Sequence, residues 1–139
     1  SHNKTAISKE KLEEFTNNYP QIKYLGKTDK ILDLLKSVDV IVLPSYREGL
    51  SKSLIEAASM KLPIITTKAP GCRDVVEEMF NGFLCEVKSK DSLEKAIYSI
   101  ISLSESKRLE YGVNGRKKVI NEFSSKIVNK IYTYKTILK

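Results

Sequence analysis

Short apolar runs alternate along this sequence with segments of helical periodicity. Four of these runs predict strands, which cover residues 22–25, 40–43, 64–67 and 83–85. Pro44 stops the second run, and Pro63 begins the third. The run at 40–43 is continuous and rich in β-branched residues, which is typical of a strand buried on both faces of a parallel sheet.

Amphipathic segments between these runs predict helices. They cover about 8–18, 29–35, 51–61, 72–79 and 91–103. The expected N-caps are Ser8, Asp29, Ser51 and Asp91, the last in a capping box with Glu94. One or two short helices follow, broken near Gly112 and Gly115. Ser124 is expected to begin a last helix with an apolar stripe.

Strands that alternate with helices predict an α/β fold, with a Rossmann-like parallel sheet flanked by helices. The length of 139 residues suits a single domain, 1–139, whose C-terminal helices cover about 91–139. The pattern G-x-G-x-x-G is absent from the sequence, so the fingerprint of dinucleotide-binding sheets is missing.

The composition is that of an ordinary globular domain, with 41% hydrophobic and 29% charged residues. No apolar run approaches the roughly 20 residues that a membrane span needs, and no signal peptide is visible. Cys72 and Cys85 form neither a disulfide framework nor a cluster with metal-ligand spacing. We therefore expect two reduced thiols, no metal and a cytoplasmic protein.

The net charge of +7 resides entirely in residues 107–139, which hold nine basic and two acidic side chains. The last predicted helix, with Lys126 and Lys130, has two interpretations. It packs its apolar stripe on the domain, which we favour, or it lies at the inner face of the membrane, attracted to anionic lipid. Nucleic-acid binding is disfavoured, because few aromatic residues are interleaved with the basic ones.

Residues 43–51 join the end of a predicted strand to the start of a predicted helix. Open α/β sheets bind ligands at this place. The free N–H groups at the start of the helix, around 50–53, suit an anion such as a diphosphate. Gly49 allows the backbone to approach a ligand closely, and Arg47 and Lys52 add positive charge.

Glu48 and Glu56 frame this segment, with seven residues between them. The two carboxyls of a glycosidase lie about 5–9.5 Å apart, whereas eight helical steps of about 1.5 Å span about 12 Å. The spacing therefore suits two carboxylates that grip different parts of one long ligand. Sugar hydroxyls are suitable partners, because carboxylates accept their hydrogen bonds.

This Glu-x7-Glu frame resembles the retaining glycosyltransferases of family GT4, which have the GT-B fold. Further segments are similar to that family in the same order along the chain, and the resemblance covers most of residues 4–139. They are 39–45, 47–50, 54–57, 63–64, 70–74 and 81–84. The residues at 70–73 are similar to the corresponding sequence of enzymes that build capsule, O-antigen and related glycans.

The resemblance implies a role for each site residue. Glu48 would contact hydroxyls of the donor sugar and Glu56 the ribose, while the backbone at 49–51 would face the diphosphate. These backbone positions are Gly49, Leu50 and Ser51. Lys27 would lie near the base, Lys52 near the phosphates, and Arg73 at the rim of the donor site. Lys27, Lys52 and Arg73 also have a plainer interpretation as solvated surface charges, and Tyr46 either packs or lines the pocket.

The expected activity is transfer of a hexose or N-acetylhexosamine, with retention, from a UDP-sugar to a lipid-linked or polysaccharide acceptor. No cofactor is implied, and no protein nucleophile or general base is assigned. GT-B enzymes have two Rossmann-like domains, and 139 residues cannot hold both. We therefore expect a partial C-terminal, donor-binding domain that lacks the acceptor-binding domain and is inactive alone.

Two other classes of function remain open. One is a non-catalytic module of the same fold that binds a nucleotide sugar or serves as an assembly surface. The other is a flavodoxin-like signalling domain. That class predicts an acidic cluster at the strand ends, and none is present at 42–44.

Overall fold

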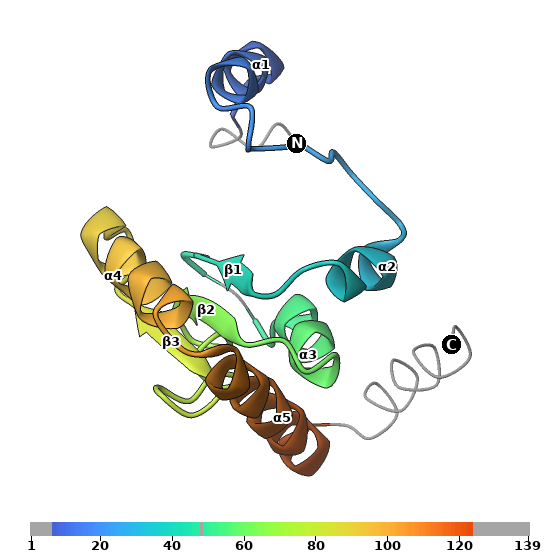
Figure 1. Cartoon of the computed structure of the whole chain (residues 1–139), viewed down its shortest axis with the longest axis vertical. Helices are drawn as coiled ribbons and strands as arrows, with labels where there is room; N and C mark the ends of the chain where they lie inside the picture. Colours follow the sequence, from blue (N-terminus) through green and yellow to red (C-terminus); the bar gives the residue numbers. More distant parts are fainter. Residues whose placement is uncertain (1–6, 48, 124–139) are drawn as a thin grey trace. The chain divides into compact units, whose positions relative to one another are not determined.

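The computed structural model describes residues 7–47 and 49–123, in two compact units that divide between Ile31 and Leu32 (Figure 1). In the first unit, helix α1 (Lys9–Asn18) begins after Ser8, whose side chain accepts a hydrogen bond from the Lys11 N–H at 3.3 Å. Both the predicted helix and its predicted cap are confirmed.

The strand predicted at 22–25 is wrong. These residues have no regular structure, and Ile22, Tyr24 and Leu25 are 41%, 66% and 58% exposed. A strand is stabilised by hydrogen bonds to a neighbouring strand. In the part of the chain that the structure describes, the sheet consists of three strands of the second unit, so an apolar run at 22–25 has no partner there.

The sheet of the second unit is parallel. Strands β1 (Ile41–Leu43), β2 (Ile64–Thr67) and β3 (Gly82–Cys85) lie side by side in chain order. Val42 pairs with Ile65, which pairs in turn with Phe83. Three of the predicted strands and the parallel α/β fold are thus confirmed.

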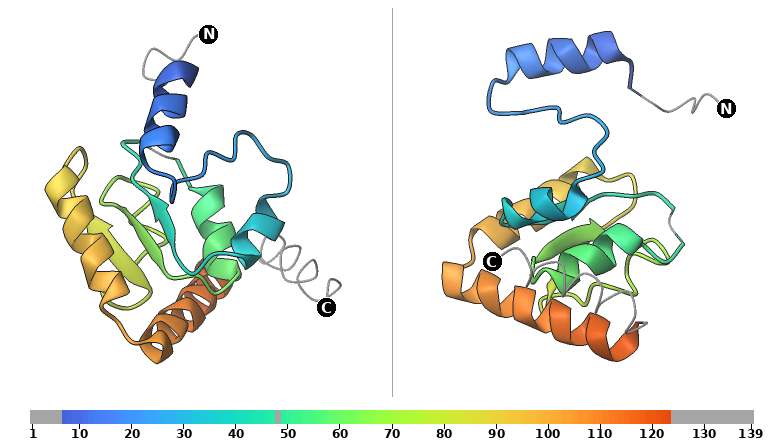
Figure 2. Two further views of the ribbon diagram at one scale, coloured as in Figure 1. Left: turned by 45° about the horizontal axis from the view of Figure 1, so that its top comes forward. Right: turned by 90° about the vertical axis from the view of Figure 1, so that its right-hand side faces the viewer.

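Helices α3 (Lys52–Ser59) and α4 (Lys90–Ile101) lie on opposite faces of this sheet (Figure 2). Alternate strand residues point to each side, so Ile64 packs with Leu54 of α3, whereas Ile65 packs with Ile100 of α4. Each of these four side chains is at most 1% exposed. A parallel sheet needs such cover on both faces, because its strands are apolar on both.

Burial on both faces holds for β2 but not for β1. All four residues of β2 are buried, whereas Val42 in the middle of β1 is 43% exposed. Within the described residues β1 pairs only with β2, and α4 lies over β3 and β2. The prediction of a fully buried strand at 40–43 is therefore wrong for the α4 side.

Helix α5 (Glu105–Glu122) follows α4, packs against α3 and runs without interruption through Gly112 and Gly115. The predicted break near these glycines is wrong. A Cβ atom at Gly112 would lie 2.0 Å from the Lys61 carbonyl oxygen, so this glycine serves close packing instead of ending the helix. The helix predicted from Ser124 lies outside the described residues.

Two further predictions are corrected by local hydrogen bonds. Residues 72–75 form turns, residues 76–77 have no regular structure, and Glu78 forms an isolated bridge with Gly82, so there is no helix at 72–79. The buried Asn81 side chain accepts from the Glu77 N–H at 2.7 Å and donates to the Val75 carbonyl at 3.0 Å, which replaces helical hydrogen bonds. Helix α4 begins after Ser89, which accepts from the Ser92 N–H at 3.1 Å, so Asp91 is not its cap.

The remaining short helix, α2 (Ile31–Lys36), confirms the helix predicted after Asp29. Its residues Leu32 and Leu35 contribute to the core under α3. Among the described helices, none combines the length and apolar character that crossing a membrane requires.

Candidate functional site

The loop between β1 and α3 lies at the carboxyl edge of the sheet. Residues 44–51 connect the end of β1 with the first residue of α3, Lys52. The sequence predicted this strand–loop–helix arrangement, and it is confirmed. Ligands of open parallel sheets bind at this edge, where loops leave the strands.

Helix α3 begins without a side-chain cap. Ser51 occupies the N-cap position, as predicted, and its carbonyl accepts the first helical hydrogen bond from the Ile55 N–H at 3.1 Å. Its side chain, however, accepts no hydrogen bond from the first turn, unlike the caps of α1, α4 and α5. The N–H groups of the first turn have no acceptor within the helix, and they carry the positive end of its dipole.

Two threonines of β2 fix the start of this loop. The Thr66 hydroxyl donates to the Leu43 carbonyl at 2.8 Å, and the Thr67 hydroxyl donates to the Ser45 carbonyl. Both threonine side chains are at most 1% exposed. Sequence reasoning did not single these residues out, although a pair of hydroxyls at the end of a buried strand is a signal for such anchoring.

Glu56 and Lys52 lie one turn apart on α3. The Glu56 side chain is 14% exposed and the Lys52 side chain 76%, and their Oε1 and Nζ atoms are 3.8 Å apart. A pair with one exposed partner stabilises a helix by only about 0.3–0.5 kcal/mol. The Glu56 side chain is thus largely covered, whereas its partner Lys52 is exposed and only weakly paired.

Glu48 lies outside the described residues, so the structure does not test its predicted contact with a sugar. Its neighbours Gly49 and Leu50 are exposed, Leu50 to 57%. A Cβ atom at Gly49 would meet no described atom within 4 Å. The close approach of a ligand to this glycine stays a prediction.

The two other predicted site residues, Arg73 and Lys27, come from other segments of the chain. Arg73 is exposed in the turns after β2, where its N–H donates to the Ala69 carbonyl at 3.1 Å and its side chain forms no ion pair with a described carboxylate. Lys27 is exposed in the first unit. Their proposed roles at the rim and near the base stay predictions.

The groups at this edge are of the kind that bind anions and hydroxyl groups. It combines an uncapped helix start, a carboxylate on the first turns of the same helix and a loop anchored to β2. Within the described ranges, no group of three or more His, Cys, Asp or Glu side chains is placed to hold a metal ion.

Comparison with known proteins shows the family. The model of the glycosyl transferases group 1 matches residues 6–118. The capsular polysaccharide biosynthesis glycosyltransferase CapM of Staphylococcus aureus is 32% identical over 82% of this chain and 30% of its own length. An Escherichia coli UDP-Gal:alpha-D-GlcNAc-diphosphoundecaprenol alpha-1,3-galactosyltransferase is 37% identical over 72% of this chain and 25% of its own. The chain thus spans less than a third of these relatives.

Solved structures agree in fold. The C-terminal domain of a glycosyl transferase group 1 protein of Francisella tularensis has a TM-score of 0.67 at 25% identity, with 82% of this chain and 61% of that chain covered. The Anabaena protein HepE, solved with UDP and glucose, has a TM-score of 0.74 at 22% identity, with 91% and 36% covered. The predicted GT-B-type fold of a C-terminal domain is confirmed. The chain belongs to the group 1 family of glycosyl transferases.

Proposed function

We propose that this chain is the donor-binding part of a retaining glycosyltransferase that uses a UDP-sugar. The observation that carries the proposal is the uncapped start of α3 at the carboxyl edge of the sheet, in a chain of this family. Free N–H groups and the helix dipole stabilise phosphate oxygens. A diphosphate at this place puts the rest of a nucleotide sugar within reach of the carboxylate on α3.

Glu56 binds the ribose of the donor in this proposal, because a carboxylate accepts two hydrogen bonds from adjacent hydroxyls. Glu48 binds the sugar, and the backbone of Gly49, Leu50 and Ser51 faces the diphosphate. Lys52 exchanges its exposed pairing with Glu56 for the phosphates. These residues bind and orient the donor, and none of them is assigned as a nucleophile or base.

The donor and acceptor classes come from the relatives. One relative by its name uses UDP-Gal, and another, from Campylobacter jejuni, is an N-acetylgalactosaminyltransferase that acts on a diphospho-undecaprenol carrier. We therefore propose transfer of a hexose or N-acetylhexosamine to a lipid-linked or polysaccharide acceptor at the inner face of the membrane. The acceptor binds to a further domain, of the kind that completes the GT-B fold.

Calorimetric titration of the chain tests donor recognition. UDP, GDP, ADP, UDP-glucose and UDP-N-acetylglucosamine are compared at equal salt. The proposal predicts saturable binding of UDP and at least one UDP-sugar, and weaker binding of GDP and ADP. It fails if no nucleotide binds.

A non-catalytic binding module of the same fold is the second candidate, because the proposed site binds and orients a donor without an assigned nucleophile or base. Both candidates bind the donor, so only turnover separates them. Release of UDP from a UDP-sugar in the presence of an acceptor, measured with the chain joined to an acceptor-binding domain, supports the transferase. Tight donor binding with no release supports the module.

A further inference from the structure

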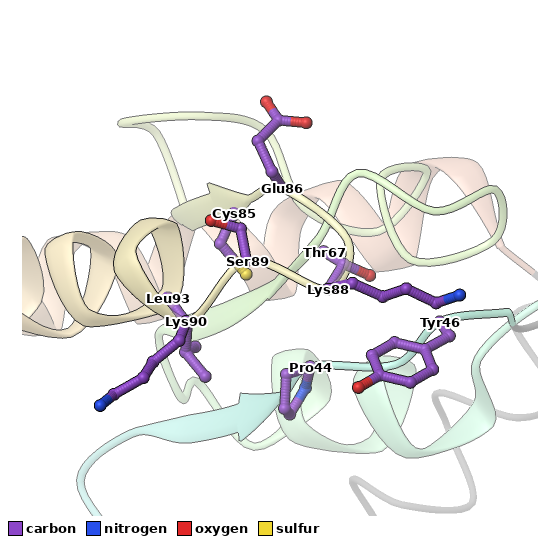
Figure 3. Close-up of a pocket in the computed structure, with 9 residues that line it drawn as sticks. All are labelled: Pro44, Tyr46, Thr67, Cys85, Glu86, Lys88, Ser89, Lys90 and Leu93. Atoms are coloured by element: carbon purple, nitrogen blue, oxygen red, sulfur yellow. The ribbon is translucent and has the colours of Figure 1, made fainter.

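A second concavity opens at the carboxyl edge of the sheet, on the side of α4 (Figure 3). It has a volume of about 280 Å³ and lies where the loops after β1, β2 and β3 meet. Its lining includes Pro44, Tyr46, Thr67, Cys85, Lys88 and Leu93. The pocket shares the loop after β1 with the candidate site, but no described residue of α3 lines it.

The turn between β3 and α4 is built to hold Lys88 in place. The Glu86 N–H donates to the Ser92 hydroxyl at 2.9 Å, and the Ser89 N–H donates to the Glu86 carbonyl at 3.3 Å. Lys88 has a φ of 60°, in the left-handed region that few residues other than glycine adopt. Hydrogen bonds on both sides maintain this conformation, so the side chain of Lys88 projects from a defined turn.

Lys88 lies over an aromatic ring. Its Nζ atom is 5.6 Å from the centre of the Tyr46 ring, within the range of cation–π contacts. Tyr46 is 64% exposed. The sequence left open whether Tyr46 packs or lines a pocket, and the structure shows that it lines one.

The pocket carries a net positive charge. Glu86 pairs with Lys68, and in Figure 3 its carboxylate points away from the other lining residues. Among the described residues, neither Lys88 nor Lys90 lies within ion-pair distance of a carboxylate. In Figure 3 the two ammonium groups point in opposite directions, and only that of Lys88 lies beside Tyr46, so an anion near Tyr46 meets Lys88.

The remaining walls are suited to an apolar ring face. Pro44, Cys85 and Leu93 contribute carbon and sulfur atoms, and the Thr67 hydroxyl already donates to the Ser45 carbonyl. Ser89 accepts the cap hydrogen bond of α4 through its oxygen, which leaves its own O–H as a donor. The pocket thus offers a ring platform, a cation at Lys88 and one hydroxyl donor.

We propose that this pocket binds a hexose phosphate, with the sugar ring on Tyr46 and the phosphate at Lys88. The anion follows from the charge of the lining residues, whereas the choice of a sugar rests on the proposed function. A volume of about 280 Å³ is just below the range of small-molecule sites, which starts near 300 Å³. This size suits one sugar and its phosphate better than a whole nucleotide sugar.

The test is a chemical-shift titration of the full chain with glucose 1-phosphate, alongside glucose, inorganic phosphate and UDP. Glucose 1-phosphate should give saturable amide shifts at Lys88–Leu93 and at Tyr46. Lys88→Gln should weaken this binding at least fivefold, and Tyr46→Leu should weaken it without abolishing the phosphate contact. Lys95→Gln, an exposed lysine on the same helix outside the pocket, should leave it unchanged.

The proposal is overturned if glucose 1-phosphate gives no saturable shifts at these residues, or if Lys88→Gln and Lys95→Gln bind it equally. Equal affinity for inorganic phosphate also overturns it, because the sugar then contributes nothing. UDP is titrated separately, and the amide shifts that it causes should fall on the first turn of α3. Their absence counts against the proposed function and leaves the hexose phosphate site standing.

Discussion

At the scale of single residues, the loop that forms the candidate site depends on side chains that a motif does not contain. Thr67 links the loop to the centre of the sheet, and it also lines the second pocket. The sequence identified Glu56 because it follows Glu48 at the spacing of the Glu-x7-Glu motif. No sequence motif identifies Thr67, because its role depends on the strand register that places it beside Ser45.

Thr67→Val removes this link and keeps the shape of the side chain. It leaves the Ser45 carbonyl without its hydrogen bond, which should lower the free energy of unfolding by about 1–2 kcal/mol. Urea denaturation measures the change. Ser99→Ala is the control, because the Ser99 hydroxyl is exposed and bonds only to its own helix, and it should change the stability by less than about 0.5 kcal/mol. Equal effects of the two substitutions would contradict the anchoring role.

The N-cap of α4 is a residue that the sequence alone identifies only ambiguously. Ser89 and Asp91 both carry side-chain oxygens that can cap a helix. Asp91 was predicted because Glu94 follows at the spacing of a capping box, but the structure places the cap at Ser89. The pattern identifies the start of the helix to within two residues, and the turn built around Lys88 selects the residue that caps it.

At the scale of elements, the sequence predicted helices and strands best where their burial agrees with their hydrophobic periodicity. The strands β2 and β3 and the helices α1 and α4 are close to the predicted ranges. The failures at 22–25 and 72–79 have different physical reasons. The apolar run at 22–25 has no partner strand among the described residues, whereas local hydrogen bonds of the Asn81 side chain replace helical ones in the second segment.

Two glycines in α5 allow a direct test of how closely this helix packs against the turn at Lys61. Gly112→Ala should lower the free energy of unfolding by about 2 kcal/mol or more, because the new Cβ would overlap the Lys61 backbone carbonyl. Gly115→Ala is the matched control in the same helix. Its Cβ would lie 3.4 Å from Asn81 and 3.7 Å from Ala58, and it should be neutral or gain up to about 1 kcal/mol from helix propensity.

Thermal and urea unfolding of the two variants measures this difference. If Gly112→Ala is as stable as Gly115→Ala, the close contact between α5 and the turn at Lys61 is not part of the folded protein. The predicted helix break would then be the better interpretation of both glycines.

At the scale of the whole molecule, the sequence predicted an α/β fold with a parallel sheet and a site at its carboxyl edge. The fold is confirmed. The site is positioned only in part, since Glu48 lies outside the described residues and Lys27 belongs to the first unit. A local motif indicates which residues meet a ligand, whereas the arrangement of units depends on contacts that the motif does not encode.

Both cysteines belong to the core of the second unit, and their reactivity reports its integrity. Cys72 and Cys85 are 0% and 1% exposed, and burial raises the pKa of the Cys85 thiol. A raised thiol pKa lowers the fraction of reactive thiolate at neutral pH. We expect the native chain to react with a thiol reagent at least 100-fold more slowly than the chain in urea, as followed by absorbance. Comparable rates would mean that the core opens readily.

The pH dependence follows from the same shift. Because the folded pKa of Cys85 lies above its unfolded value, the folded state retains the proton longer, and this contribution to stability is complete below the ordinary pKa of a thiol. It is lost as the pH rises through the folded pKa. Cys85→Ser should therefore flatten the decline of the unfolding free energy on the alkaline side.

The central claim is that the first turns of α3 bind the nucleotide of a UDP-sugar, and calorimetry of Glu56→Ala tests it most directly. The claim predicts that this variant binds UDP and UDP-glucose at least fivefold more weakly than the unchanged chain, and that Glu94→Ala, an exposed glutamate on α4, binds both as before. Glu48→Ala should weaken only the binding of UDP-glucose. Unchanged affinity of Glu56→Ala for UDP would contradict the claim.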